Sequence, residues 1–121
     1  MNQAIELQHF INGHPTHDAG ARWGDVFNPA TGRLSARVPL ASAVTTGAAI
    51  AAAAAALPEW ANTSPLRRAR ILFKFRELLE RHIDELAAIV TAEHGKVLAD
   101  AKGEIIRGME YVESVAIVRA V

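Results

Sequence analysis

The clearest hydrophobic pattern in the chain is a helical stripe in its second half. Between residues 65 and 94, apolar side chains recur at steps of three or four, which places them on one face of an α-helix. Ser64, followed by proline, is a typical N-cap, and Gly95 stands where a left-handed C-terminal residue is expected. Asp84 could cap a new segment, so the pattern allows a kink near His82. The stripe consists of Ile71, Phe75, Leu79, Ile83, Leu86 and Val90, widened by Leu72, Leu78 and Ile89.

A second helical stripe begins near Leu98 and continues toward the end of the sequence. Gly103 and Gly108 interrupt it, and each costs a helix roughly 1 kcal/mol relative to alanine. We therefore expect another backbone or a ligand to approach this helix closely at the glycines. The stripe consists of Leu98, Ala101, Ile105, Met109, Val112 and Ala116.

The first forty residues show the shorter period that is typical of strands. Residues 9–14 predict a short strand that ends in an Asn-Gly turn, followed by a polar loop as far as Gly20. Residues 23–27 and 34–38 alternate in polarity on either side of a Pro- and Gly-containing turn, so they predict a hairpin. Pro39 lacks a ladder donor and is expected to end the second strand.

An alanine-rich helix is expected between these two halves. Ser42 is a plausible N-cap for a helix over residues 43–57, because alanine has the highest helix propensity and lets a neighbour pack closely. Pro58 either ends this helix or starts a further turn. The predicted fold is a β-hairpin region over residues 9–40 followed by three or four helices over residues 42–119, without a second βαβ unit or a closed parallel sheet.

Composition and charge exclude several classes of protein. Thirteen basic side chains balance thirteen acidic ones, so the chain lacks the basic surface of a nucleic-acid binder or of a membrane-surface protein. Its amino terminus lacks the basic and apolar regions of a signal peptide. The longest apolar run, residues 48–57, is far shorter than the roughly 20 residues that span a bilayer. We therefore expect a soluble cytoplasmic protein with no nucleic-acid or membrane partner.

The absence of cysteine narrows the chemistry further. Without Cys the chain offers no disulfide, no thiolate metal ligand and no thiol nucleophile. The five histidines are scattered without the spacing of metal ligands. Gly95 and Lys96 end a helix instead of opening one, which is the wrong polarity for binding phosphate. The residues by themselves therefore predict no catalytic group, no metal site and no cofactor-binding site.

One charged residue, Arg107, has two interpretations. It lies beside Gly108 on the last predicted helix. Helical spacing allows an ordinary intrahelical pair with Glu104 or Glu110. The alternative is a guanidinium beside a glycine gap that is available to bind a carboxylate in bidentate fashion.

Several segments, in order and at natural spacing, resemble the aldehyde dehydrogenase superfamily. Each is weak alone, but their order makes the resemblance strong, and it covers about residues 9–113. Residues 100–110 are most similar to the CoA-acylating branch that acts on methylmalonate semialdehyde. From Ser114 onward the sequence departs from the usual continuation. The segments are residues 9–13 (HFING), 27–32 (FNPATG), 55–61 (AALPEWA), 73–79 (FKFRELL) and 93–96 (EHGK).

The resemblance implies an NAD-dependent oxidation. In this family a Cys thiolate captures the aldehyde, and a hydride then passes to NAD, which leaves a thioester on the Cys. In this branch the thioester loses carbon dioxide, and its acyl group is transferred to CoA to give propionyl-CoA or acetyl-CoA. The nucleophile, the oxyanion-stabilising Asn and the Gly-rich NAD contacts have no counterpart in this chain. Only Arg107 carries over, as a residue that helps to hold the substrate's carboxylate. We therefore expect the chain alone to be inactive and to bind neither NAD nor CoA.

The resemblance also bears on the fold and on the partners. In the family, the amino-terminal hairpin and helices belong to the NAD-binding domain and pack on a Rossmann-like sheet that later sequence builds. We therefore expect an incomplete domain, an α+β fragment of an α/β protein that lacks this sheet. Its apolar stripes must face each other, another chain or water. The alternative to a dehydrogenase fragment is a non-enzymatic helical module that pairs with itself or with a full-length dehydrogenase subunit.

Overall fold

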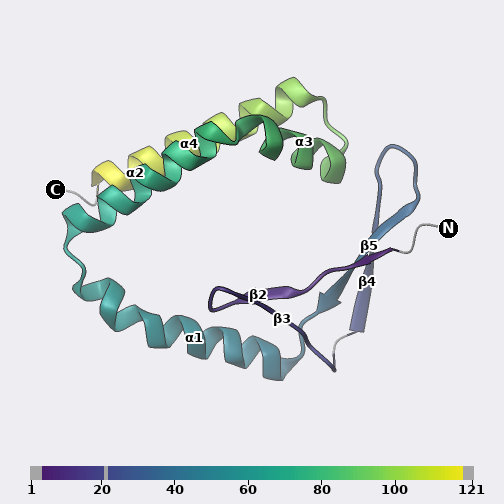
Figure 1. The fold of residues 1–121 in the computed structure, drawn as a ribbon, viewed down its shortest axis with the longest axis horizontal. Helices are drawn as coiled ribbons and strands as arrows, with labels where there is room; N and C mark the ends of the chain where they lie inside the picture. Colours follow the sequence, from purple (N-terminus) through teal and green to yellow (C-terminus); the bar gives the residue numbers. More distant parts are fainter. Residues whose placement is uncertain (1–3, 21, 119–121) are drawn as a thin grey trace. The chain divides into compact units, whose positions relative to one another are not determined.

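The computed structural model describes residues 4–20 and 22–118, and the chain divides after residue 61 into two compact units (Figure 1). The first unit holds all the strands and the first helix, and the second holds three further helices. Residue 119, the expected end of the last helix, lies outside the described residues. The elements are β1 (Ile5–Glu6), β2 (His9–Ile11), β3 (His14–Thr16), β4 (Arg22–Phe27), β5 (Leu34–Leu40), α1 (Ala43–Asn62), α2 (Pro65–Arg81), α3 (Ile83–His94) and α4 (Leu98–Val118).

The predicted hairpin is confirmed as β4 and β5, which pair antiparallel with Val26 opposite Ala36. Its turn is held by Asn28, whose Oδ1 accepts the N–H groups of Ala30 at 2.9 Å and Thr31 at 3.0 Å. Gly32 takes a φ of 68°, which a glycine adopts without strain. Local turn chemistry therefore accounts for this part of the prediction.

The expectation that Pro39 ends its strand was wrong. β5 continues to Leu40, with Pro39 opposite Trp23 of β4. β1 pairs in parallel with β5 only at Ala36 and Arg37, so at Pro39 the strand has a neighbour on one side alone. A proline that lacks its donor is tolerated at such an edge.

The polar loop expected up to Gly20 was partly wrong, because residues 14–16 form β3 and pair with β2. Asn12 and Gly13 connect the two strands with φ values of 53° and 81°. Positive φ at both central positions is the pattern of a type I′ turn, for which Asn-Gly is the preferred sequence. The turn directs the chain back along β2, which the predicted strand alone did not show.

α1 begins where the sequence indicates and continues beyond its expected end. Ser42 is confirmed as the N-cap, because its Oγ accepts the N–H of Thr45 at 3.2 Å. The helix includes Pro58 and reaches Asn62, so Pro58 does not end it. Inside a helix, proline removes one hydrogen bond and crowds the carbonyl four residues before it, so α1 continues through Pro58 at an energetic cost. Within the described part of the chain, α1 has no buried residue.

Asp18, which had no role in the sequence prediction, connects the strand region to the start of α1. Its buried carboxylate accepts the N–H of Ser42 at 2.8 Å and the N–H of Gly20 at 3.1 Å. The hydrogen bond from the Ser42 backbone, followed by the hydroxyl of Thr45, lowers the pKa of Asp18 to about 2. A carboxylate at this helix end also meets the positive end of the helix dipole.

In the second unit, local signals define the helix boundaries as predicted. The Oγ of Ser64 accepts the N–H of Arg67 at 3.4 Å, and Gly95 is left-handed with a φ of 80°. α2 and α3 are separated at His82, which confirms the kink. Asp84 caps neither helix; its carboxylate lies 2.5 Å from Nζ of Lys102 on α4.

The second unit packs around small side chains. Most of the predicted stripe of α4 faces its core, because Ala101, Met109 and Ala116 are buried, whereas Leu98 at its start is exposed. On α2, Ala69 is buried, and its inward face continues through Leu72 and Leu79, which are less exposed than their neighbours. The remaining apolar residues of α2 are exposed, so only part of the predicted stripe faces α4. They include Ile71, Phe75 and Leu78.

An ionic contact connects α2 with α4, which lie side by side (Figure 1). The Nε of Arg76 donates to Oε1 of Glu113 at 2.6 Å, and the same guanidinium donates to Glu80 one turn further along α2. The hydrogen bond to Glu113, followed by that to Glu80, raises the pKa of Arg76. No helix among the described residues is both long and apolar enough to cross a bilayer.

The Asp18 contacts predict a dependence of stability on pH. Because the pKa of Asp18 falls from 3.8 to about 2 on folding, its stabilisation is complete above about pH 4 and is lost as the pH falls toward 2. Asp18→Asn should lower the urea midpoint at pH 7 and reduce its fall between pH 4 and 2. Asp25→Asn, which removes a half-exposed carboxylate beside Arg37, is the control. Equal pH profiles for wild type and Asp18→Asn would contradict this assignment.

The small core of the second unit predicts that enlarging two neighbouring alanines on α3 has very different effects on stability. Ala87 is fully buried and Ala88 is exposed. Ala87→Leu should therefore destabilise the chain by about 1–3 kcal/mol through overpacking, whereas Ala88→Leu should change it by less than about 0.5 kcal/mol. Urea denaturation followed by helical circular dichroism measures both. A similar cost at the two positions would show that α3 does not pack as described.

Candidate functional site

Arg107 lies on the face of α4 that is turned away from the core. Ile105 and Met109, two residues to either side, belong to the inward stripe, and a step of two residues rotates a helix by about 200°. Packing of the stripe therefore turns the guanidinium outward, and its side chain is exposed. The same packing fixes which residues stand beside it on this face.

The structure does not form the intrahelical ion pair that spacing allows for Arg107. Glu104 instead accepts a hydrogen bond from Nζ of Lys96, and this bond is the main cause of the lowered pKa of Glu104. No ion pair of Arg107 forms within the described part of the chain, since Glu104 pairs with Lys96, although the positive charge of Arg107 also helps to lower the pKa of Glu104. The guanidinium thus keeps its donors available.

A shallow hollow of about 350 Å³ lies around Arg107 and is bordered by Glu110, Tyr111 and Ser114. These residues follow Arg107 at three, four and seven positions, so they lie along one helix face. A guanidinium with two hydroxyls nearby can bind a carboxylate, but one exposed ion pair contributes only about 0–1 kcal/mol. The role of Arg107 in holding a substrate therefore stays a prediction that needs a second wall to the hollow.

The two glycines of α4 are not approached closely by any described part of the chain. A Cβ built on Gly103 or on Gly108 would meet nothing within 4 Å. The predicted close approach therefore does not occur between the described residues. An approach by another backbone or by a ligand remains a prediction.

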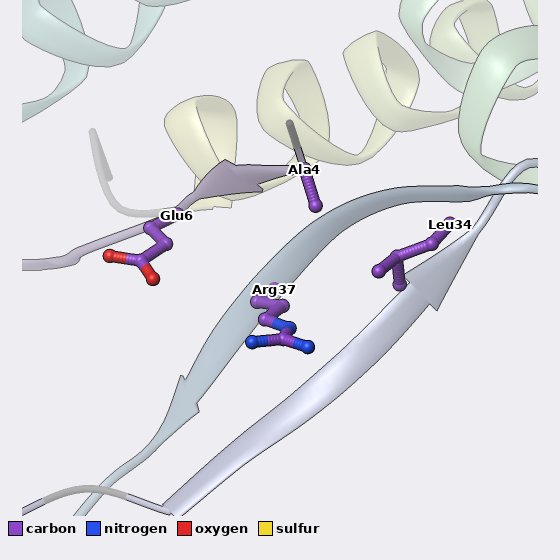
Figure 2. A pocket seen from close by; sticks show the side chains of 4 residues that line it. All are labelled: Ala4, Glu6, Leu34 and Arg37. Carbon is purple, nitrogen blue, oxygen red and sulfur yellow. The ribbon is translucent and has the colours of Figure 1, made fainter. Parts of the chain in front are cut away.

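A second hollow, of about 600 Å³, lies beside the sheet of the first unit and is bordered by Ala4, Glu6, Leu34 and Arg37 (Figure 2). The parallel register of β1 and β5 places Glu6 beside Arg37. The guanidinium of Arg37 already lies 3.3 Å from a carboxylate oxygen of Asp25. This hollow combines both charges with apolar walls, and its residues do not form a catalytic set.

No group of three or more potential metal ligands comes together among residues 4–20 and 22–118. His9 is the histidine nearest to a carboxylate in the first unit, with its Nε2 4.0 Å from Oδ2 of Asp18. That nitrogen is buried and has no hydrogen-bond partner. The carboxylate of Asp18 already accepts hydrogen bonds from backbone N–H groups, so we assign His9 and Asp18 a structural role. No local sequence signal points to this cluster, because Asp18 lies 24 residues before its partner Ser42.

Comparison with known protein families gives one match over most of the chain. The model of the Aldehyde dehydrogenase family matches residues 16–119. This interval includes the hairpin, α1, α2, α3 and the described part of α4. Arg107 lies within it.

Among characterised proteins, the malonate-semialdehyde dehydrogenase of Pseudomonas aeruginosa is 49% identical over 107 residues, which are 88% of this chain and 21% of the relative. The human mitochondrial methylmalonate-semialdehyde/malonate-semialdehyde dehydrogenase [acylating] is 40% identical over 104 residues, 86% of this chain and 19% of the relative. The chain thus spans about a fifth of the length of these proteins.

Solved structures agree with the sequence comparison. A Sinorhizobium meliloti 1021 structure assigned as methylmalonate-semialdehyde dehydrogenase and complexed with NAD matches with a TM-score of 0.91 and 45% identity, over 96% of this chain and 24% of that one. The methylmalonate-semialdehyde dehydrogenase of Oceanimonas doudoroffii matches with a TM-score of 0.89 and 46% identity, over 93% and 23%. The described fold corresponds to one part of a larger α/β protein, and the chain belongs to the aldehyde dehydrogenase family.

Proposed function

We propose that this chain is the amino-terminal segment of an NAD-dependent, CoA-acylating dehydrogenase for malonate or methylmalonate semialdehyde. The observation that carries the proposal is the agreement among relatives. The matched proteins from Pseudomonas aeruginosa, Homo sapiens and Oceanimonas doudoroffii all have names of this type and align with 86–93% of the chain. The substrate is thus a short aldehyde that carries a carboxylate.

The chain's own residues do not supply the reactive groups of such an oxidation. It has no Cys in 121 residues to act as the nucleophile. No Gly-rich phosphate loop links a strand to a helix in the sequence, so no residue is assigned here to NAD or to CoA. Bound NAD would accept a hydride, and CoA would accept the acyl group, in the remainder of a complete enzyme. The segment's proposed contribution is to position the substrate.

Arg107 is the residue to which we assign this contribution. Its guanidinium is exposed and has no ion-pair partner among the described residues, which leaves both of its paired donors available to a carboxylate. Residues from another part of the enzyme would close the hollow and reduce the solvent screening. A guanidinium held in such a closed site binds more strongly than one exposed to water.

A second candidate function is that of a non-enzymatic interaction module that pairs with itself or with a full-length dehydrogenase subunit. The observation that favours it is the small core, because no large side chain is fully buried in the part of the chain that the structure describes. Exposed apolar faces on the helices of both units are suited to a protein partner. Sedimentation of the chain alone and mixed with such a subunit distinguishes the two partners.

The missing nucleophile predicts that the purified chain does not oxidise semialdehydes. Mixed with NAD, CoA and methylmalonate semialdehyde, it should produce no NADH above the blank, measured by absorbance at the NADH band. The full-length Pseudomonas aeruginosa relative is the positive control. NADH formation that depends on this chain would contradict the proposed division of roles.

The assignment of Arg107 predicts a selective loss of substrate binding. In a chimera that carries this segment within the Pseudomonas aeruginosa relative, Arg107→Gln should raise KM for malonate semialdehyde roughly 10- to 100-fold, since charged hydrogen bonds contribute about 1.5–3 kcal/mol. KM for propanal, which lacks the carboxylate, should change little. Arg107→Lys keeps the charge without the planar fork and should be intermediate. Equal losses for both aldehydes would indicate a structural role instead.

A further inference from the structure

Arg107, to which we assign the substrate's carboxylate, has a potential competitor for that carboxylate on its own helix. Glu104 lies three residues before it, which is within reach of an intrahelical ion pair. The carboxylate of a glutamate and that of a substrate offer a guanidinium the same pair of oxygens. A bond between Arg107 and Glu104 would therefore reduce the fraction of molecules that can bind the substrate.

A second glutamate, Glu110, follows Arg107 by three residues, but its order in the helix is less favourable. An acidic residue stabilises an ion pair on a helix more when it precedes its basic partner than when it follows it. Glu104 has the favourable order and Glu110 has the reverse. Glu104 is therefore the stronger of the two potential competitors.

Lys96 binds this competitor from outside the helix. It lies in the connection between α3 and α4, directly after the left-handed Gly95 that ends α3. Its Nζ donates to Oε1 of Glu104, eight residues further along the chain. This hydrogen bond is the main cause of the lowered pKa of Glu104, and the charge of Arg107 contributes less. Glu104 is also not among the described residues that border the hollow around Arg107.

The contact between Lys96 and Glu104 is better shielded from water than the other lysine ion pairs of this unit. The side chain of Lys96 is 22% exposed, compared with 39% for Lys102 and 59% for Lys74. Solvent and salt screen a pair less when one partner is withdrawn from water. Lys96 is thus suited to hold Glu104 persistently.

From these observations we propose that Lys96 is a positioning residue for substrate binding, because it holds Glu104 away from Arg107 and keeps the guanidinium free. The inference rests on the proposed function of Arg107 and adds a residue to it. Without Lys96, Glu104 pairs with Arg107 and the substrate must displace it. A pair at this helical spacing forms in about half to two-thirds of molecules, so KM should rise about 2- to 3-fold.

The first test detects the exchange of partners in the chain itself, without substrate or cofactor. Carbon-detected NMR measures the pKa of the Glu104 carboxyl in wild type, Lys96→Met, Arg107→Gln and the double variant. Arg107→Gln should raise this pKa at least roughly twice as much in the Lys96→Met background as in wild type, because Arg107 is then the partner of Glu104. Circular dichroism verifies that the helices are kept. Equal increments in the two backgrounds would overturn the proposal.

The second test measures the effect on substrate in the same chimera that is used for Arg107. Lys96→Met should raise KM for malonate semialdehyde about 2- to 3-fold and leave both kcat and KM for propanal unchanged. Adding Glu104→Gln should restore the wild-type KM, because the competitor is then removed. Adding Glu110→Gln instead makes the same change of charge on the other side of Arg107, and KM should stay raised.

Two results of this kinetic test would overturn the role of Lys96. One is an unchanged KM in Lys96→Met, and the other is equal recovery with Glu104→Gln and Glu110→Gln, which would indicate a general effect of charge. Failure of this inference is distinguishable from failure of the proposed function. If Arg107→Gln does not affect KM selectively, the proposed function itself fails; if it does and Lys96→Met has no effect, only the role of Lys96 fails.

Discussion

The limit on this molecule is how little it buries. The buried apolar residues in the described part of the chain are four alanines and Met109, and α1 contributes none. A buried methyl group is worth about 0.8 kcal/mol, whereas a buried Leu, Ile or Phe contributes about 1.5–3 kcal/mol. The stability of a domain is a small difference between large terms, so the number of large side chains withdrawn from water matters. Small residues let the helix backbones approach closely, and the larger apolar side chains remain outside, where another protein surface can cover them.

This limit also determines on which side of α4 the proposed substrate-binding residue Arg107 lies. Because Ala101, Met109 and Ala116 pack inward, the opposite side of α4 receives Arg107, Tyr111 and Ser114. Polar contacts stabilise this orientation from the edges. Lys102 pairs with Asp84 of α3, and Glu113 pairs with Arg76 of α2. The buried stripe and the ion pairs to α3 and α2 together fix the rotation of α4 about its axis. The proposed site on its outer side remains open to solvent.

Local signals in the sequence predicted the features that depend on neighbouring residues alone. Ser64, Gly95 and the Asn12–Gly13 pair each satisfy backbone groups within a few positions, so their effect is visible without the fold. The features that were missed depend on distant partners. The end of β5 beyond Pro39 depends on where β1 stops pairing, and Asp18 acquires its role only when Ser42 is placed beside it.

The same distinction applies to the candidate site. Periodicity correctly assigned the inward stripe of α4, and hence the side on which Arg107 lies. It could not separate the two apolar faces of α2, because Leu72 and Ile71 are equally hydrophobic and only packing against α4 selects one of them. Nor could spacing decide whether Arg107 pairs with Glu104, since that glutamate is taken by Lys96 from beyond the helix end. The proposed role of Arg107 came from family resemblance, which supplies the partner that this chain's own residues do not.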